Sequence, residues 1–381
     1  MASLEYENRL EGCRGFNGPY PSAPLDERYS IVRRGWHPDM HRASALFKTV
    51  TEGFEGGDGR PIREMEITLL EEVERWLSRR SWSVSDRPLE RVLAAKRGTT
   101  VSVVLPALNE EATVGDIVRA IRRELMTEEV PLVDELVVID SGSTDRTAEV
   151  AAAAGARVVS RDGILPRIPA VPGKGEVLWR SLMVTSGDVV CFVDADLRDF
   201  SADFVTGIVG PLLTDPDVEF VKAMYDRPFG DTPGQGGRVT ELVARPLLNL
   251  HWPRLAGFVQ PLGGEYAARR SLLERLPFPV GYGVELGLLV DALHTVGLDA
   301  LAQVDVGVRK HRHQDGQALG RMAAAIYRTA QLRLSRGHLV RPRLTQFERG
   351  EAGFEPRTYA VDTEERPPMA EITEYAHRRV A

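Results

Sequence analysis

The chain has 381 residues, of which 43% are hydrophobic and 27% are charged, an ordinary composition for a globular protein. Its formal net charge of −7 argues against broad nucleic-acid binding, which requires a basic surface. The sequence shows no signal peptide, no apolar run long enough to cross a membrane and only two cysteines, so we expect a cytoplasmic protein without a membrane or nucleic-acid partner.

The first segment, residues 1–98, differs in character from the rest of the chain. Apolar residues recur at helical spacing over residues 64–80, which predicts an amphipathic helix, and a second helix is predicted over 89–96. This segment contains no recognisable group of chemically active side chains. Packing or contact between subunits is therefore its expected role.

From Thr99 onward, strand patterns alternate with helix patterns. Strands are predicted over 101–108, 135–139, 157–160, 189–196 and 218–224, and helices over 111–126, 145–154 and after Gly175. This alternation implies an α/β fold with a mainly parallel sheet. Further helices are expected from near Arg238, over 282–294 and over 317–334, with a strand over 301–308 and a polar, partly disordered tail after Gly337.

The most informative stretch is the apolar run that begins at Val189 and ends in Asp194-Ala195-Asp196. Such a run predicts a strand buried on both faces, with the carboxylates at its carboxyl end, where open α/β sheets bind ligands. Two hard oxygen ligands suit a divalent cation shared with phosphates. The same spacing occurs in Asp215-Pro216-Asp217, where the proline indicates a turn, and strand-end aspartates also cap helices. Spacing alone thus leaves both interpretations open.

Other loops exclude some classes of nucleotide-binding protein. Neither 106–111 nor 140–145 has the Gly-x-Gly-x-x-Gly pattern of dinucleotide-binding domains, and Gly173-Lys174-Gly175 is no Walker A loop. The Gly-rich segment 230–237 precedes a predicted helix and forms either an anion site with Arg238 and Thr240 or a plain flexible connection.

Taken in order, these loops make the chain resemble retaining glycosyltransferases of the GT-A fold and, more narrowly, the glucosyl- and mannosyl-3-phosphoglycerate synthases. The resemblance runs from about Val101 to His313. It rests on seven motifs in the family's order, Leu105–Glu111, Asp140–Asp145, Pro172–Glu176, Asp194–Asp196, Gly237–Leu242, Gln260–Tyr266 and Gly281–Glu285.

The resemblance implies transfer of a hexose from a nucleotide-sugar to the 2-hydroxyl of D-3-phosphoglycerate, with retention of the α-anomeric configuration. It also implies an organisation in four parts. These are an N-terminal helical extension (1–98), a nucleotide-sugar-binding α/β domain (99–227), an acceptor-binding region with C-terminal helices (228–337) and a C-terminal tail (338–381).

The resemblance further implies roles for individual residues. The expected donor-binding residues are Pro106, Ala107, Leu108, Glu110, Asp140, Lys174, Asp194, Ala195, Leu262, Glu285 and Arg309. Asp140 would accept a hydrogen bond from the base, Lys174 would neutralise diphosphate charge, and Asp194 would face the ribose and sugar.

The remaining site residues belong to the acceptor, the metal and the reaction. Gly237, Arg238, Thr240 and His313 are expected to bind the acceptor. Asp196 and His311 are the expected metal ligands, with Mg²⁺ as the expected cation and Mn²⁺ or Co²⁺ as alternatives. Asp194, Asp196, Glu285 and His311 form the expected catalytic group, and no side chain is indicated as a general base.

Two departures bear on the choice of sugar. Ala195 lies between the paired carboxylates, where the glucosyl enzymes have Ser, and His313 occupies an acceptor position where they have Asn. With the longer N-terminal segment, these features favour transfer of mannose from GDP-mannose. The alternative is transfer of glucose from UDP-glucose or GDP-glucose.

Two other classes of protein are less consistent with the sequence. A sugar-1-phosphate nucleotidyltransferase would require a Gly-rich basic loop at 106–110, which is acidic here. A sugar-nucleotide-binding protein without catalysis would not require acceptor motifs. We also expect a homodimer, paired through the helices predicted over 64–80 and 317–334.

Overall fold

The chain is described from a computed structural model, which covers residues 69–228, 237–310, 315–334, 343–350, 353–361 and 364–380. The chain divides into two units, Met1–Glu66 and Ile67–Ala381, and all of the described residues belong to the second. The expectations for residues before 69, for most of the loop 230–237 and for His311 and His313 fall outside the described residues.

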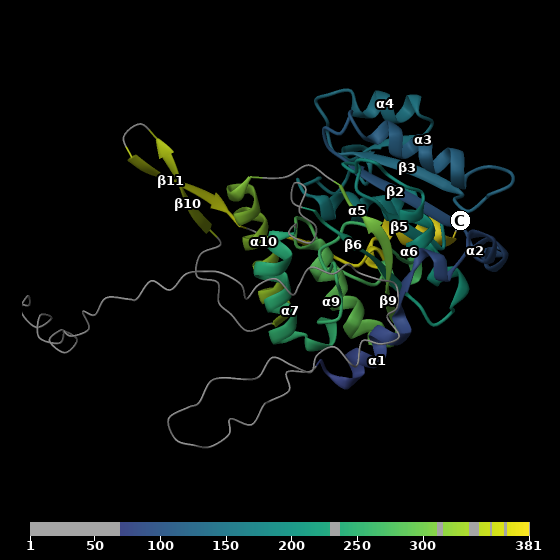
Figure 1. Cartoon of the computed structure of the whole chain (residues 1–381). Helices are drawn as coiled ribbons and strands as arrows, with labels where there is room; N and C mark the ends of the chain where they lie inside the picture. The colour runs from purple at the N-terminus through teal and green to yellow at the C-terminus, as the bar shows by residue number, and fades with distance from the viewer. Residues whose placement is uncertain are drawn as a thin grey trace, which may run out of the picture. The chain divides into compact units, whose positions relative to one another are not determined.

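An eight-stranded sheet forms the centre of the second unit, in the order β1-β9-β6-β7-β5-β2-β3-β4 (Figure 1). Its strands are β1 (Ser81–Ser83), β2 (Val101–Ala107), β3 (Glu135–Asp140), β4 (Arg157–Ser160), β5 (Val189–Phe192), β6 (Phe220–Asp226), β7 (Tyr266–Arg269) and β9 (Leu301–Val308). Every neighbouring pair is parallel except those of β7, which runs antiparallel to both β5 and β6. The predicted α/β fold with a mainly parallel sheet is confirmed.

Helices cover both faces of this sheet. They are α1 (Glu71–Arg80), α2 (Leu89–Lys96), α3 (Val114–Leu125), α4 (Thr147–Ala153), α5 (Lys174–Val184), α6 (Asp203–Thr214), the π-helix η4 (Thr240–Ala244), α7 (Arg245–His251), α8 (Arg270–Leu273), α9 (Val284–Val296), α10 (Gly316–Leu334) and α11 (Thr373–Val380). Short 3₁₀ turns are η2 (Val84–Asp86), η3 (Arg161–Gly163), η5 (Pro253–Leu255), η6 (Leu298–Ala300) and η7 (Met369–Glu371).

The core has two parts because alternate residues of a strand face opposite sides of the sheet. On β5, Val190 and Phe192 belong to one cluster with α1, α5, α7, α9 and α10, whereas Val189 and Cys191 belong to the other with α2, α3 and α6. All four residues of β5 are buried, as the continuous apolar run predicted. The carboxylates that follow β5 therefore leave the sheet from a rigid central position.

The first described elements form one edge of the sheet. β1 pairs in parallel with β9, Ser81 opposite Gln303. In α1, the Trp76 indole donates to the Leu301 carbonyl at 2.7 Å and its ring lies 4.6 Å from that of Phe258. The apolar side of α1 thus packs against the core of the same chain.

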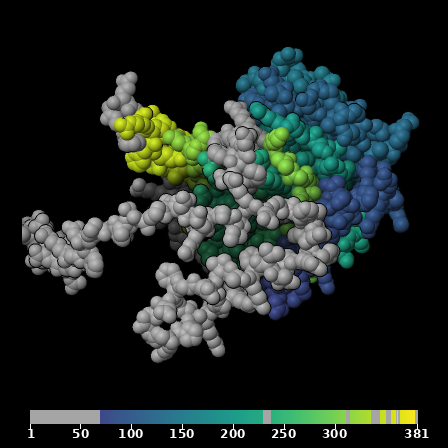
Figure 2. Space-filling model, in the orientation of Figure 1, coloured from purple at the N-terminus to yellow at the C-terminus, as the bar shows by residue number. Residues whose placement is uncertain are grey.

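The C-terminal segment contains regular structure. β10 (Arg343–Gly350) and β11 (Gly353–Ala360) form an antiparallel hairpin, and β12 (Glu365–Arg366) pairs with β8 (Phe278–Pro279). The hairpin lies beside α10 on the surface in Figure 2, where Gln346 donates to the Gln317 carbonyl at 3.3 Å. Met369 and Tyr375 bury their side chains in the core, so this described part of the segment after Gly337 is packed against the rest of the chain. Among the described residues, no helix has the length and apolarity needed to span a bilayer.

Candidate active site

The paired carboxylates lie directly after β5, at the carboxyl end of the parallel strands. The backbone between them is anchored, because the Thr113 hydroxyl donates to the Ala195 carbonyl at 2.6 Å. The side chains remain accessible, with 20% of Asp194 and 30% of Asp196 exposed. The second Asp-x-Asp triplet is a turn, in which the Val218 amide donates to the Asp215 carbonyl at 3.3 Å. Context, not spacing, distinguishes the two.

Direct contacts join Asp194 and Asp196 to Arg309 and Lys174, and Lys174 joins them to Glu285. Arg309, which follows β9, donates through Nη2 to Asp194 Oδ2 at 2.8 Å and to Asp196 Oδ1 at 3.2 Å. Lys174, at the start of α5, contacts Asp194 Oδ1 and lies 2.8 Å from Glu285 Oε1 on α9. Four separate elements thus bring two cations and three carboxylates into one network.

A second layer holds Arg309 in place. Glu265 is completely buried, and its two oxygens accept hydrogen bonds from Arg309 Nε at 2.8 Å and from the Tyr225 hydroxyl at 2.7 Å. The Nη1 atom of Arg309 is buried and has no hydrogen-bond partner among the described residues. Glu265 occurs in a motif quoted above but received no role there, although a carboxylate at the entrance to an apolar strand was a usable signal.

Charge separates the two aspartates in their protonation. Burial disfavours ionisation of Asp194, but Lys174 and Arg309 outweigh it and lower its pKa to about 2. Burial and the neighbouring Asp194 charge instead raise the pKa of Asp196. Burial also opposes the charge of Lys174, whose pKa is nevertheless raised by Asp194 and Glu285. Asp196 is therefore the carboxylate whose ionised form has the greater need of another cation.

The chemistry around Asp196 fits a divalent cation. A half-exposed hard oxygen ligand beside cationic side chains suits a metal that also binds phosphate oxygens. Within the described ranges no cluster of three or more His, Cys, Asp or Glu side chains is placed to hold a metal, and the second expected ligand, His311, lies outside them.

The loop before β7 closes against this network. A Cβ added to Gly264 would collide with the Asp194 carboxylate and with Lys174 Nζ, so only glycine permits this approach. Lys222 on β6 supports the loop from below by donating to the Gly263 carbonyl at 2.7 Å. Leu262, an expected donor residue, is part of the same loop and is half-buried.

Lys222 makes stability depend on pH in a way that can be measured. Burial lowers its pKa from 10.5 to about 8. Below about pH 8 both the folded and unfolded states hold the proton, whereas between the two values only the unfolded state does, so the free energy of unfolding rises with pH. We expect a rise of roughly 2 kcal/mol between about pH 7.5 and 9.5 that Lys222→Met removes, measured by urea unfolding. Equal pH dependence of the two proteins would contradict this assignment.

The loops expected to hold the nucleoside are tied to each other. Ala107, which ends β2, pairs with Asp140, which ends β3. The Asp140 carboxylate accepts hydrogen bonds from the Gly142 amide at 3.2 Å and the Ser143 amide at 3.3 Å, and the Glu110 amide donates to Thr147 Oγ1 at 2.7 Å. Pro106 on β2 pairs with Ile139 on β3, and the Leu108 side chain is 54% exposed. The structure therefore shapes these loops, while the base contact itself stays a prediction.

The expected acceptor residues are only partly described. Gly237 has a φ of +78°, and its carbonyl accepts a hydrogen bond from the Glu241 amide at 3.1 Å as η4 begins. Thr240 is buried at the start of η4. His313 lies outside the described residues. The acceptor site thus stays a prediction.

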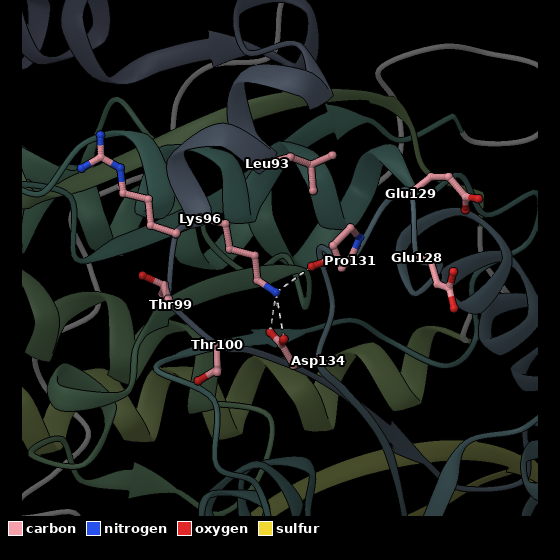
Figure 3. A pocket seen from close by; sticks show the side chains of 10 residues that line it. Leu93, Lys96, Thr99, Thr100, Glu128, Glu129, Pro131 and Asp134 are labelled. Atoms are coloured by element: carbon pink, nitrogen blue, oxygen red, sulfur yellow. Dashed lines mark hydrogen bonds and ion pairs between the residues drawn. The ribbon is translucent and has the colours of Figure 1, made fainter.

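A separate pocket of about 480 Å³ lies at the opposite end of the strands (Figure 3). It is lined by Thr100, which precedes β2, and by Asp134, which precedes β3. Lys96 Nζ fills part of it with bonds to the Pro131 carbonyl at 2.6 Å and to Asp134 at 2.8 Å. It contains none of the predicted site residues.

Comparisons with known proteins agree with this geometry. Residues 102–254 match the model of glycosyl transferase family 2. The chain is 50% identical over 304 residues to the glucosyl-3-phosphoglycerate synthase of Mycolicibacterium smegmatis, covering 78% of this chain and 98% of the relative.

Two solved structures are also similar. One is the glucosyl-3-phosphoglycerate synthase of Mycobacterium tuberculosis in complex with Mn²⁺, UDP and glucosyl-3-phosphoglycerate (48% identity, TM-score 0.67, 76% of this chain and 95% of that chain). The other is the mannosyl-3-phosphoglycerate synthase of Rubrobacter xylanophilus (42% identity, TM-score 0.74, 80% of this chain and 99% of that chain).

Proposed function

Since the chain belongs to the glucosyl-3-phosphoglycerate synthase family of glycosyltransferases, we propose that it transfers glucose from UDP-glucose to the 2-hydroxyl of D-3-phosphoglycerate. The observation that carries this proposal is the 50% identity over nearly the whole length of a glucosyl-3-phosphoglycerate synthase. The sequence departures favoured mannose, but the relatives support the glucose alternative. The similarity to the Rubrobacter mannosyl-3-phosphoglycerate synthase keeps transfer of mannose from GDP-mannose as a second candidate.

The network at the carboxyl ends of the strands supports a separate role for each of its residues. Lys174 and Arg309 supply positive charge for the diphosphate, and Glu285 binds the sugar at the position fixed by its contact with Lys174. Asp194, already neutralised by both cations, orients them and faces the sugar. The buried Nη1 of Arg309 has no hydrogen-bond partner among the described residues, and it is a donor for a phosphate oxygen.

A divalent metal would be held by Asp196 together with His311. When bound, it would offset the charge that builds on the departing diphosphate. Mn²⁺ in the structure of the mycobacterial relative supports a divalent metal as the cofactor. Retention of configuration fits attack by the acceptor hydroxyl on the face from which the diphosphate leaves, since no described side chain is placed as an obvious nucleophile or general base.

The donor is tested by supplying the purified protein with 3-phosphoglycerate and either Mg²⁺ or Mn²⁺. UDP-glucose, GDP-glucose and GDP-mannose are added separately, and the products are identified by mass spectrometry and sugar analysis. We expect kcat/KM for UDP-glucose to exceed that for the other donors by at least about tenfold. A preference for GDP-mannose would establish the second candidate, and no transfer from any donor would refute the activity altogether.

We also propose a homodimer, in which α10 is retained from the expected contact and η4 and α7 take the place of α1. The apolar side of α1 is packed inside the chain, whereas exposed apolar side chains gather on η4, α7 and α10, namely Leu242 (76%), Leu250 (77%), Tyr327 (47%) and Leu332 (40%). A second copy of the chain would cover these side chains.

Leu250→Glu is expected to shift the protein toward the monomer by weakening dimer association at least about tenfold, because a charge would be buried at the contact. Light scattering after size-exclusion chromatography measures the mass. Leu69→Glu, at an exposed position near the start of α1, is the matched control. A monomeric wild-type protein would refute the proposed dimer.

A further inference from the structure

The last part of the chain lies against two segments that carry expected donor-binding residues. These are the start of α5, with Lys174, and the segment from β8 to α9, with Glu285. β12 pairs antiparallel with β8, placing Arg366 opposite Phe278, and the Val280 amide donates to the Glu364 carbonyl at 2.9 Å. On α5, the Trp179 indole donates to the Pro367 carbonyl at 2.9 Å. The segment Glu364–Pro367 thus contacts both α5 and the strand that leads to α9.

Arg366 makes the strongest of these contacts. Its Nε and Nη2 atoms donate to the two oxygens of Glu176 at 2.6 and 3.0 Å, and Nη2 also reaches the Pro169 carbonyl at 2.7 Å. Glu176 is completely buried, and its other cation is Arg180, with Nε at 2.6 Å. A bidentate pair of this kind fixes both distance and orientation.

The position of Glu176 links this pair to the donor site. Glu176 lies two residues after Lys174 in the first turn of α5, and its amide donates to the Val280 carbonyl at 3.1 Å. Lys174 in turn lies 2.8 Å from Glu285, which follows Val280 by five residues. A Cβ on Gly175 would collide with the Pro279 carbonyl, so the two backbones already touch. Arg366 therefore holds the start of α5 against the segment that runs from β8 to α9.

We propose that Arg366 is a positioning residue for the nucleotide-sugar, acting through Glu176 and the β8–β12 pair on the placement of Lys174 and Glu285. This inference rests on the proposed transferase function. Lys174 and Glu285 are proposed donor-binding residues, so the effect of Arg366 on their placement should appear in donor binding and not in recognition of 3-phosphoglycerate.

The test compares steady-state kinetics of Arg366→Met and Arg366→Lys with wild type. Arg366→Met is expected to raise KM for the nucleotide-sugar by about tenfold, while KM for 3-phosphoglycerate changes by less than about twofold. Arg366→Lys keeps one charge without the bidentate geometry and should recover part of the donor affinity. Glu176→Gln keeps the size of the side chain and should change KM in the same direction if Arg366→Met does not fold.

Tyr375→Phe is the matched control from the same C-terminal segment. Its hydroxyl contacts Glu274 at 2.5 Å and Arg270 at 3.3 Å, and it contacts neither Lys174 nor Glu285. It should lower the thermal midpoint without raising the donor KM. Inactive wild-type protein would refute the proposed function, whereas active protein with an unchanged donor KM in the Arg366 and Glu176 variants would overturn only the positioning role. Equal increases in both KM values would also overturn it.

Discussion

Replacing Asp196 with Ala is expected to lower kcat by about a thousandfold, because the site would lose the carboxylate that we propose as a metal ligand. Asp196 is the less strongly paired of the two carboxylates, with one contact to Arg309 at 3.2 Å. Its removal should therefore leave the thermal midpoint nearly unchanged. Steady-state kinetics measure the loss of kcat, and calorimetric titration with Mn²⁺ measures the loss of metal binding.

Asp217→Ala provides the matched control for this variant. Asp217 belongs to the other Asp-x-Asp triplet of the chain, is exposed, and lies in the turn before β6. Activity and metal binding should match wild type in this control. Normal turnover by Asp196→Ala would show that the metal and the diphosphate do not depend on this carboxylate.

Replacing Glu265 with Ala should lower the free energy of unfolding by about 3 kcal/mol, because it removes the buried partner of Arg309. The Tyr225 hydroxyl would lose its acceptor as well. Since Arg309 also contacts Asp194 and Asp196, donor affinity should fall together with stability. Urea unfolding measures the first effect and the KM for the nucleotide-sugar measures the second.

Glu348→Ala is the control for the loss of an ion pair at the surface. Glu348 lies 3.2 Å from Arg357 on the hairpin, and both side chains are at least 40% exposed. Exposed pairs of this kind contribute less than about 1 kcal/mol. Equal destabilisation by the two substitutions would mean that Glu265 is not a buried structural anion.

The centre of the fold and of the site could be predicted because each signal was local. A continuous apolar run followed by Asp194 and Asp196 predicts a buried strand with carboxylates at its end. The family resemblance then implied that Lys174, Glu285 and Arg309 act at the same site, and the contacts of the structure bring all five together.

The elements that were not predicted have physical reasons for their weak signals. α6 contains Gly207, Gly210 and Pro211, which normally argue against a helix. A Cβ on Gly207 would lie 3.0 Å from Val306 Cγ1, so close packing of α6 on the sheet leaves little room for a side chain. β7 and β12 have four and two residues, too few to show a period.

The buried partners of the site could not be read from spacing, because they act across the fold. Glu265 meets Arg309 from 44 positions away, and Glu176 meets Arg366 from 190 positions away. Lys222 did give a signal, a lysine within an otherwise apolar strand. A charged residue in such a place requires a partner, but the sequence does not name it.

The contact of β12 with β8 also has a consequence for the order of events during synthesis. A ribosome delivers Lys174 and Glu285 long before Arg366, so the nascent chain can build most of its sheet while the donor side of the site still lacks its last contacts. Activity should therefore arise only after Arg366 has left the ribosome. A fusion partner attached at the C-terminus would carry Arg366 out of the ribosome while synthesis continues, so the pairing of β12 with β8 could form before the chain is released.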